Sequence, residues 1–529
     1  MTPTGNQLEL KRERDCEREV RIALSSSLSA GFHIDVEAFN FLTLISKTQS
    51  PAKLIEATLS KLQKLEDSPL FISRDILEET AEEIFPEKEE SNVLTKASAS
   101  RESLTGKLKN AFIPRARDIQ KDVVVLEDPT TKTCSTGSID EYLACFKDRF
   151  QRMTRLLRRR MDSRDAMTIK DAFRAAPKTK VKIIAMVTEK RESHHGVFLR
   201  VEDLQSSTTV LIPRNSSREL REQARLLLPD QVICLSLTKS RRGLLIAQEL
   251  FFPDIPRRKP AGAKEEVYAA LISDLHVGSR ECMESEFARF LLWLNGKYGN
   301  KDLRDVAGLV KYVVIAGDVV DGIGIYPNQV DELEVLDVFE QYKKAAGFIE
   351  QIPDYIEVIV IPGNHDASRK ALPQPALPKD YAEPLFEKRD IISLGNPSTI
   401  SLHGVECLVY HGRSLDDVLA TAADMDFHSP ERAMRLMLRS RHLAPSYGQR
   451  TLIAPESRDF LVIERIPDIL HAGHVHVMKH CFYNGTLLVN SGAWQGQTSY
   501  QRNLGLEPTP GIVPVVNLKT LAVTPIDFT

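Results

Sequence analysis

The chain has few of the features that mark secreted or membrane proteins. Only seven of its 529 residues are cysteine, and no two of them form a Cys-x-x-Cys pair. Their scatter argues against a disulfide framework or a zinc knuckle and indicates reduced thiols. Residues 1–19 lack the apolar core of a signal peptide, and no apolar run approaches the length of a membrane span. We therefore expect a cytoplasmic protein with no membrane partner.

The chain also has little net charge. Its formal net charge is −3, although 27% of its residues are charged. The overall charge therefore does not attract nucleic acid, and any such contact must use local basic patches. The hydrophobic content of 42% is ordinary for a globular protein. Because 529 residues are too many for one core, we expect two or three domains.

The amino-terminal part has helical patterns followed by a polar stretch. Residues 1–85 predict a small helical domain, in which Ser50-Pro51 is a typical helix start followed by apolar residues at helical spacing. Residues 86–137 are rich in Ser, Lys and Glu and have few large apolar groups. Such a segment buries too little surface to order itself, so we expect a flexible linker.

Residues 138–258 predict a leading helix and a small barrel. Ser138 and Glu141 have the spacing of a capping box at the start of the helix. Five short β-rich runs begin near Lys180, and a helical stretch at about 217–228 precedes the fourth run. This order is typical of a Greek-key barrel of the OB type.

Two roles are open for this barrel. OB barrels often bind single strands by stacking bases on aromatic rings. Here the strand region has only three aromatic residues, which are Phe198, Phe251 and Phe252. We therefore favour a role in docking the carboxy-terminal domain or a partner over a role in base stacking.

Residues 265–529 alternate strand and helix patterns, and five apolar runs each end in residues that commonly bind metals. These residues are Asp274 and His276, Asp318 and Asp321, the run Asn364-His365-Asp366, His411, and lastly His474 and His476. In an open α/β layer, ligands bind beyond the carboxyl ends of the strands, so we expect all five clusters on one rim. Taken alone, most of these clusters could be turns or structural histidines, and only Gly473-His474-Val475-His476 is moderately specific. The joint pattern favours a metal site.

The residue types suit two metal ions. Imidazole and carboxylate together favour Mn, Fe or Zn, and the amide oxygen of Asn364 adds a hard neutral ligand. Asp318 has two oxygens and is placed to bridge two cations. In each of the pairs Asp274/His276 and His474/His476, the two-residue spacing on an extended chain places both side chains on one face.

The order Asp-x-His, Gly-Asp-x-x-Asp, Gly-Asn-His-Asp, His, Gly-His-x-His resembles the calcineurin-like metallophosphoesterases. With the barrel and the helical domain in front, the whole chain resembles the small subunits of archaeal family D DNA polymerases. The resemblance implies a multidomain α/β fold. It would contain a phosphoesterase β-sandwich flanked by helices, preceded by an OB-type β-barrel and a small amino-terminal helical domain.

The resemblance also implies a role for each motif residue. The first metal would be held by Asp274, His276, Asp318 and His476, and the second by Asp318, Asn364, His411 and His474. His365 would be the catalytic histidine that binds no metal and protonates the leaving 3′-oxygen. The related eukaryotic B subunits share the architecture but have lost these ligands. This sequence keeps every position of the pattern, so the resemblance implies retained activity.

Four further residues are candidates for supporting roles. We interpret Asp321 as a carboxylate that orients a metal ligand. Asp366 is expected either to hold His365 in one tautomer or to cap the following turn. Arg369 and Arg413 follow ligand clusters and are candidates for holding the substrate backbone.

The implied activity is a metal-dependent 3′–5′ exonuclease that proofreads DNA. It would use two divalent ions, with Mn favoured and Fe or Zn as alternatives, while Mg would serve the associated polymerase activity. The partners would be a large catalytic subunit in a heterodimer, DNA with single-stranded or mispaired 3′ ends, and a sliding clamp. Two other functions stay open at this point. They are a free-standing metallophosphoesterase or nuclease, and an assembly subunit with little catalysis.

Overall fold

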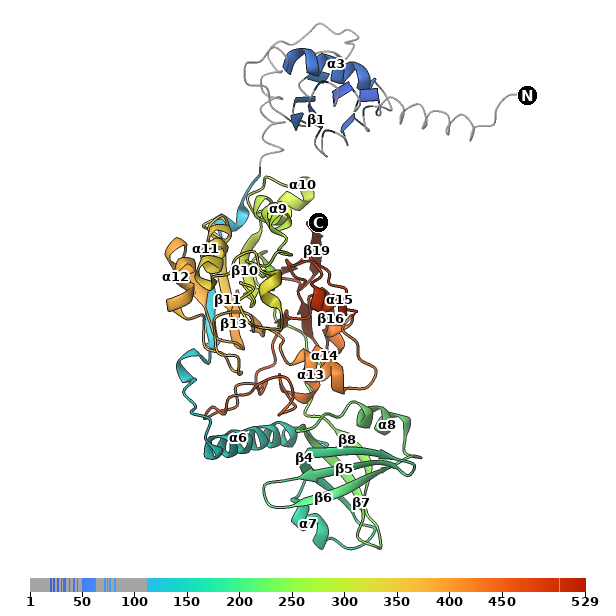
Figure 1. The fold of residues 1–529 in the computed structure, drawn as a ribbon. Coiled ribbons are helices and arrows are strands. Elements are labelled where there is room, and N and C mark those ends of the chain that lie inside the picture. The colour runs from blue at the N-terminus through green and yellow to red at the C-terminus, as the bar shows by residue number, and fades with distance from the viewer. Residues whose placement is uncertain are drawn as a thin grey trace, which may run out of the picture. The chain divides into compact units, whose positions relative to one another are not determined.

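The structure is a computed structural model that describes residues 112–503 and 505–529, together with scattered residues between 20 and 81. The chain divides into two units, residues 1–106 and residues 107–529. Figure 1 follows the chain from one end to the other. No described helix combines the length and apolarity needed to cross a membrane.

The described part of the first unit is built around helix α3 (Pro51–Leu62). The helix begins at Pro51, as the Ser50-Pro51 pair predicts, and it buries Leu54 and Ile55 in a small apolar core. A parallel pair of two-residue strands, β1 (His33–Ile34) and β2 (Phe71–Ile72), adds a sheet that we did not predict. Strands this short have no detectable alternation of apolar and polar residues.

The prediction of a flexible linker over residues 86–137 is wrong for its second half. Residues 86–111 lie outside the described residues. Beyond them, strand β3 (Val123–Glu127) pairs antiparallel with β13 (Ser398–Leu402), between the short 3-10 helices η1 (Arg115–Arg117) and η2 (Thr130–Lys132). The three consecutive valines of β3 strongly favour a strand. The edge strand β13 supplies hydrogen-bond partners for the backbone of β3, which water would otherwise solvate.

The next segment forms the predicted leading helix and a closed barrel. Helix α6 (Ile139–Arg158) begins with the predicted capping box, in which Ser138 and Glu141 bond each other's backbone. A short helix, α7 (Ile169–Arg174), leads into the barrel, whose strand order is β4-β5-β6-β8-β7. Helix α8 (Arg218–Arg225) precedes the fourth strand, as predicted. The strands are β4 (Lys180–Ser193), β5 (Gly196–Glu202), β6 (Ser207–Pro213), β7 (Val232–Lys239) and β8 (Leu245–Phe251).

Two six-stranded sheets make up the rest of the second unit. The first has the order β12-β11-β10-β9-β18-β19. Its strands are β9 (Tyr268–Ile272), β10 (Val310–Ala316), β11 (Glu357–Ile361), β12 (Ile391–Ser393), β18 (Ile512–Asn517) and β19 (Val523–Asp527). The second has the order β16-β17-β15-β14-β13-β3. Its other strands are β14 (Val405–Val409), β15 (Ile469–Ala472), β16 (Lys479–Tyr483) and β17 (Thr486–Asn490).

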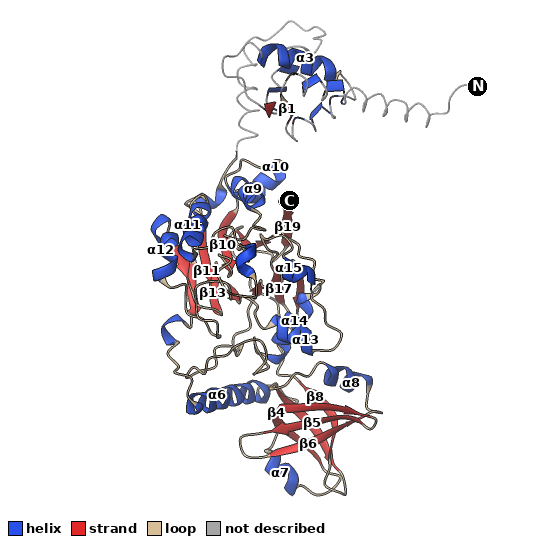
Figure 2. Ribbon diagram, viewed as in Figure 1, coloured by secondary structure: helices blue, strands red, loops and turns tan. Residues whose placement is uncertain are grey.

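The two sheets share one apolar core and are covered by helices on their outer faces (Figure 2). Alternate residues of β10 face opposite ways, with Val314 in the core between the sheets and Val313 in the core under the helices. All seven residues of β10 are buried, which is typical of a central parallel strand. The remaining helices are α9 (Glu284–Leu294), α10 (Lys301–Ala307), η3 (Gln329–Glu332), α11 (Val338–Ile349), α12 (Lys379–Lys388), α13 (Leu415–Thr421), α14 (Pro430–Ser440) and α15 (Ser499–Asn503).

A buried ion pair joins the leading helix of the barrel to the segment between helix α14 and strand β15. Arg149 Nε of α6 lies 2.6 Å from Asp459 Oδ2, and both side chains are 2% exposed. Arg149 also donates to the carbonyl of Pro445, and Arg152 donates to the carbonyl of Asp459. Removing one partner of such a pair leaves an uncompensated buried charge.

We expect Arg149→Met to destabilise the protein by about 3–5 kcal/mol, because the substitution leaves the Asp459 carboxylate buried without its cation. Arg174→Met is the matched control, since Arg174 is 71% exposed in its pair with Asp171. The control should change stability by no more than about 0.5 kcal/mol. Denaturant unfolding of both variants measures the difference. Equal losses of stability in the two variants would show that the buried ion pair contributes no more than the exposed one.

The same pair predicts a pH dependence. Burial opposes ionisation of Asp459, but the neighbouring Arg149 and His442 hold the pKa of this carboxyl far below its ordinary value of 3.8. A depressed pKa stabilises the fold above the unfolded-state pKa, and that stabilisation is lost as the pH falls. The gap in unfolding free energy between wild type and Arg149→Met should therefore shrink during acid titration. A gap that stays constant with pH would contradict this account.

Candidate metal centre

The five predicted clusters meet at one rim of the two sheets. They follow the carboxyl ends of β9, β10, β11, β14 and β15, as expected from the strand pattern. A cavity of about 290 Å³ opens there. Its lining includes six residues of these clusters, which are His276, Asp318, Asn364, His365, His474 and His476. Asp274 and His411 lie behind this lining and are fully buried.

The backbone at this rim adopts an unusual conformation. Five of the predicted ligands have positive φ angles between 49° and 70°, and these are Asp274, His276, Asp318, His474 and His476. A left-handed conformation costs a non-glycine residue on the order of 1–3 kcal/mol and is typical of functional sites. The chain also needs glycine here, because a Cβ on Gly363 would lie 2.1 Å from Asp318 Oδ1.

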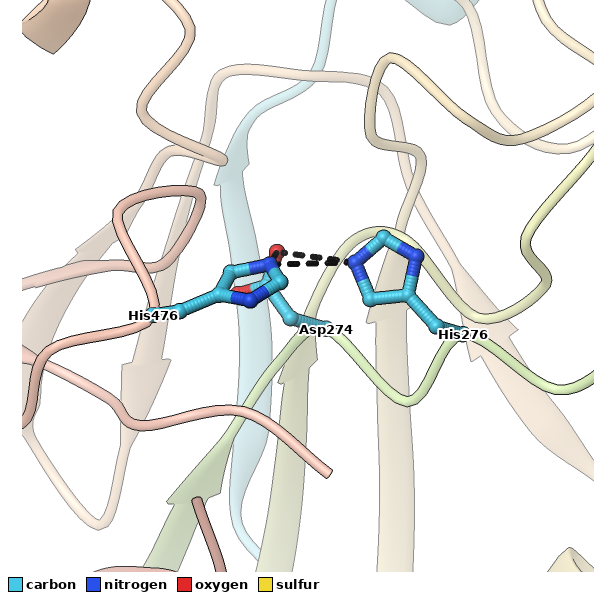
Figure 3. Close-up of side chains that lie close together, drawn as sticks. All are labelled: Asp274, His276 and His476. Carbon is cyan, nitrogen blue, oxygen red and sulfur yellow. Dashed lines mark hydrogen bonds and ion pairs between the residues drawn. The ribbon is translucent and has the colours of Figure 1, made fainter. Parts of the chain in front are cut away.

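Asp274, His276 and His476 form the first group of possible ligands (Figure 3). The Nε2 atoms of the two imidazoles are 3.1 Å apart, and Asp274 Oδ1 is 3.5 Å from His476 Nε2 and 3.9 Å from His276 Nε2. Asp274 Oδ2 accepts the backbone N–H of His474, but the buried Oδ1 accepts no hydrogen bond from any described residue. An unpaired buried carboxylate oxygen is costly. A cation with ligand bonds of about 2.0–2.2 Å fits these spacings and satisfies that oxygen.

The second group contains Asp318, Asn364, His411 and His474. His411 Nε2 lies 3.2 Å from Asp318 Oδ2 and 3.0 Å from Asn364 Oδ1. Donor atoms of Asp318, His411 and His474 lie within 4.8 Å of one another. Asp318 Oδ2 is also 3.9 Å from His276 Nε2, so it lies between the two groups. This is the position that a bridging carboxylate requires.

The electrostatics of the rim favour a cation. Burial alone would lower the pKa of His276, yet the carboxylates of Asp321, Asp318 and Asp274 raise it to about 9. His411 behaves in the same way, since its burial is outweighed mainly by Asp318 and its pKa is raised to about 9. The carboxylates thus create a negative potential that metal ions would neutralise.

Three imidazoles have an acceptor at the ring nitrogen that faces away from the possible metal. The contacts are His276 Nδ1 to Asp321 Oδ1 at 2.8 Å, His411 Nδ1 to the Ala316 carbonyl at 2.8 Å, and His474 Nε2 to Asp416 Oδ2 at 3.2 Å. Such acceptors fix the tautomer and leave the other nitrogen free to bind metal. Asp321 therefore lies where the prediction of an orienting carboxylate requires.

Sequence reasoning missed three side chains around the rim. Asp416 contacts both His474 and Arg413, Gln501 Nε2 lies 2.8 Å from His476 Nδ1, and Gln495 donates to Asp321. None belongs to a recognised motif. In sequence, Asp416 has the place of an acidic residue in the first turn of a helix, which usually interacts only with the helix dipole.

His365 and Asp366 are held by different parts of the chain. His365 Nδ1 lies 2.8 Å from the backbone carbonyl of Asp321, and burial lowers the pKa of His365 to about 4. Asp366 accepts the backbone N–H groups of Gly363 and Val319. The side chain of Asp366 therefore holds the loops that follow β10 and β11. This is neither of the two roles predicted for it, because these loops do not follow Asp366 in the chain and His365 Nδ1 faces the Asp321 carbonyl.

The two candidate arginines differ. Arg413 lines the cavity and bonds Asp416 at 2.8 Å. Arg369 forms an ion pair with Glu456 at 2.6 Å and bonds the carbonyl of Pro373, and it does not line the cavity. The side chain of Arg369 is therefore bound to a buried carboxylate outside the cavity, and its contact with substrate stays a prediction.

Comparison with known proteins identifies the family. Residues 269–479 match the family of the B subunits of DNA polymerase alpha/epsilon. The DNA polymerase II small subunit of Methanothermobacter thermautotrophicus is 39% identical over 408 residues, which cover 77% of this chain and 83% of that one. The corresponding protein of Archaeoglobus fulgidus is 40% identical over 392 residues, covering 74% and 78%.

The chain spans less than two thirds of two other relatives. The DNA polymerase II small subunits of Pyrococcus furiosus and Pyrococcus abyssi are 39% and 40% identical over 393 residues. These matches cover 74% of this chain but only 64% and 63% of the two relatives. The resemblance drawn from the sequence motifs is confirmed, and the chain belongs to the family of archaeal DNA polymerase II small subunits.

Proposed function

We propose that the chain is a polymerase small subunit that hydrolyses DNA phosphodiesters at 3′ ends with two metal ions. The observation that carries the proposal is the convergence of seven donor side chains in two adjoining groups at one rim, where Asp274 Oδ1 is a buried oxygen that accepts no hydrogen bond from the described residues. An assembly subunit without catalysis would gain nothing from this strained and charged rim.

Each residue of the rim has a place in this proposal. Asp274, His276, Asp318 and His476 would hold one metal, and Asp318, Asn364, His411 and His474 the other. Mn suits this mixture of imidazole, carboxylate and amide donors, with Fe and Zn as alternatives. When bound, the two ions would activate a water molecule for attack on phosphorus and neutralise the phosphate charge.

His365 would act as the general acid. The Asp321 carbonyl keeps a proton on Nδ1, so Nε2 is the atom that would carry the transferred proton. The negative phosphodiester would favour the protonated ring and raise the pKa of His365 from its low value. The proton would then pass to the leaving 3′-oxygen. Arg413, held by Asp416, would contact the phosphate oxygens.

The barrel would serve docking more than base stacking. Its closed strand order, with a helix before the fourth strand, supports the OB type. Phe252 is only 4% exposed, and the Arg439 guanidinium lies 4.5 Å from its ring centre. The Phe252 ring therefore already packs against Arg439 of helix α14, in the phosphoesterase part of the chain. The proposed partners are a large catalytic subunit, whose polymerase activity would use Mg, and a sliding clamp.

We expect Asp318→Ala and His474→Ala to lower Mn-dependent degradation of 3′-mismatched DNA by more than about hundredfold, because each removes a ligand. Both should also bind less Mn in calorimetry. Asp171→Ala is the control, since its carboxylate is half exposed, bonds Thr168 and Arg174, and lies outside the cavity. Full activity in the two ligand variants would exclude this site as the nuclease.

His365→Ala should separate metal binding from catalysis. We expect Mn affinity to stay within about twofold, while the hydrolysis rate falls by roughly 10²–10⁴, the usual contribution of a general acid. Calorimetry and single-turnover cleavage of single-stranded DNA measure the two quantities. A wild-type rate with both metals bound would refute the acid role.

A further inference from the structure

The cavity at the metal centre has a second set of side chains that the proposed chemistry does not use. Tyr326, Tyr500, Ile325, Pro327 and Leu506 all line it, and none is a metal-ligand type. They form an aromatic and apolar wall beside His365, whereas Arg413 lies beside His474. The substrate would therefore meet two unlike surfaces, one suited to phosphate and the other to a flat apolar group.

Tyr326 is the inner residue of this wall. Its ring centre lies 6.2 Å from that of His365, and its hydroxyl donates to Glu332 Oε2 at 3.0 Å. The hydrogen bond and the adjoining helix η3 hold the ring in one orientation. A fixed aromatic ring next to the catalytic histidine can position a planar group without losing much conformational freedom itself.

Tyr500 is the outer residue. Its ring centre is 5.9 Å from that of Tyr326 at an interplanar angle of 31°, and Tyr500 is 48% exposed. Helix α15, which carries it, buries none of its residues. Tyr500 therefore contributes little to a core, and its exposed face is available to a ligand. Burying such a face against another flat ring is favourable.

We propose that Tyr326 and Tyr500 form a stacking surface for one unpaired nucleobase next to the scissile phosphate. The inference deepens the proposed function, on which it rests. A nucleobase is the flat group that a DNA phosphodiester carries close to its phosphorus, and bases stack on tyrosine without regard to sequence. The cavity volume of about 290 Å³ is at the small end of ligand pockets, which suits one nucleotide.

The stacking surface would select unpaired ends. A base can reach the tyrosines only after it leaves the helical stack, and that step is easiest for a mispaired or single-stranded base. The site would thus select 3′ ends by how easily the terminal base leaves the duplex. It would need no contact specific to any base. Correctly paired 3′ ends would enter it rarely.

The test compares two oligonucleotides that differ only in the 3′-terminal residue, which is a thymidine in one and an abasic tetrahydrofuran in the other. We expect wild type to prefer the thymidine by about tenfold to hundredfold in kcat/KM. In Tyr500→Ala this ratio should fall toward one, and in Tyr500→Phe it should persist, because phenylalanine keeps the stacking face. Tyr326→Leu should lower the ratio as well.

Tyr381→Ala is the matched control, since Tyr381 is 52% exposed on α12 and lies outside the cavity. It should keep the wild-type ratio. The inference is overturned if Tyr500→Ala keeps the ratio too, or if wild type does not distinguish the two oligonucleotides.

Binding separates this inference from the proposed function. Fluorescence anisotropy with the same oligonucleotides in EDTA measures affinity without turnover. A preference for the thymidine end that disappears in Tyr500→Ala supports the stacking surface, even if no variant hydrolyses DNA with Mn. Preferential binding without hydrolysis would contradict the proposed nuclease activity but not the stacking surface. Equal affinity of wild type for both ends would overturn the stacking surface, whatever the hydrolysis rates.

Discussion

Burial of the carboxylates of Asp274 and Asp318 among imidazoles is the constraint on which the candidate site depends. Each carboxylate uses one oxygen to accept a backbone N–H and directs the other toward imidazole nitrogens. Burying these anions is costly without a positive charge among them. Because metal binding would relieve this cost, it would also stabilise the rim that holds the ligands. The wall of tyrosines, the orienting acceptors and the contacts of Asp366 with the loops after β10 and β11 are all arranged around this centre.

The rest of the second unit holds the backbone of the candidate metal centre rigid. The central strands are buried on both faces, so the positions where they end are well defined. The left-handed residues at those ends are unfavourable locally, and the packing of two sheets and their helices offsets that cost. The barrel is fixed to this part of the chain, because Arg149 of its leading helix and Asp459, in the loop before β15, form a buried ion pair.

Much of this arrangement could be predicted from the sequence, for physical reasons that also explain the failures. Buried parallel strands have long apolar runs, so the rim and its seven possible ligands were recognisable from where those runs end. Strand β3 was missed because three valines inside a polar segment form a strand only when a sheet edge is available. Asp416 was missed, and the ion pair of Arg369 with Glu456 was not foreseen, because both depend on partners distant in sequence, which no local spacing indicates.

Anomalous diffraction at the Mn absorption edge from crystals soaked in Mn²⁺ tests the central claim most directly. The account predicts two peaks. One would contact Asp274, His276 and His476, the other Asn364, His411 and His474, and Asp318 would contact both. Peaks elsewhere, with these side chains bonded only to protein or water, would contradict the account.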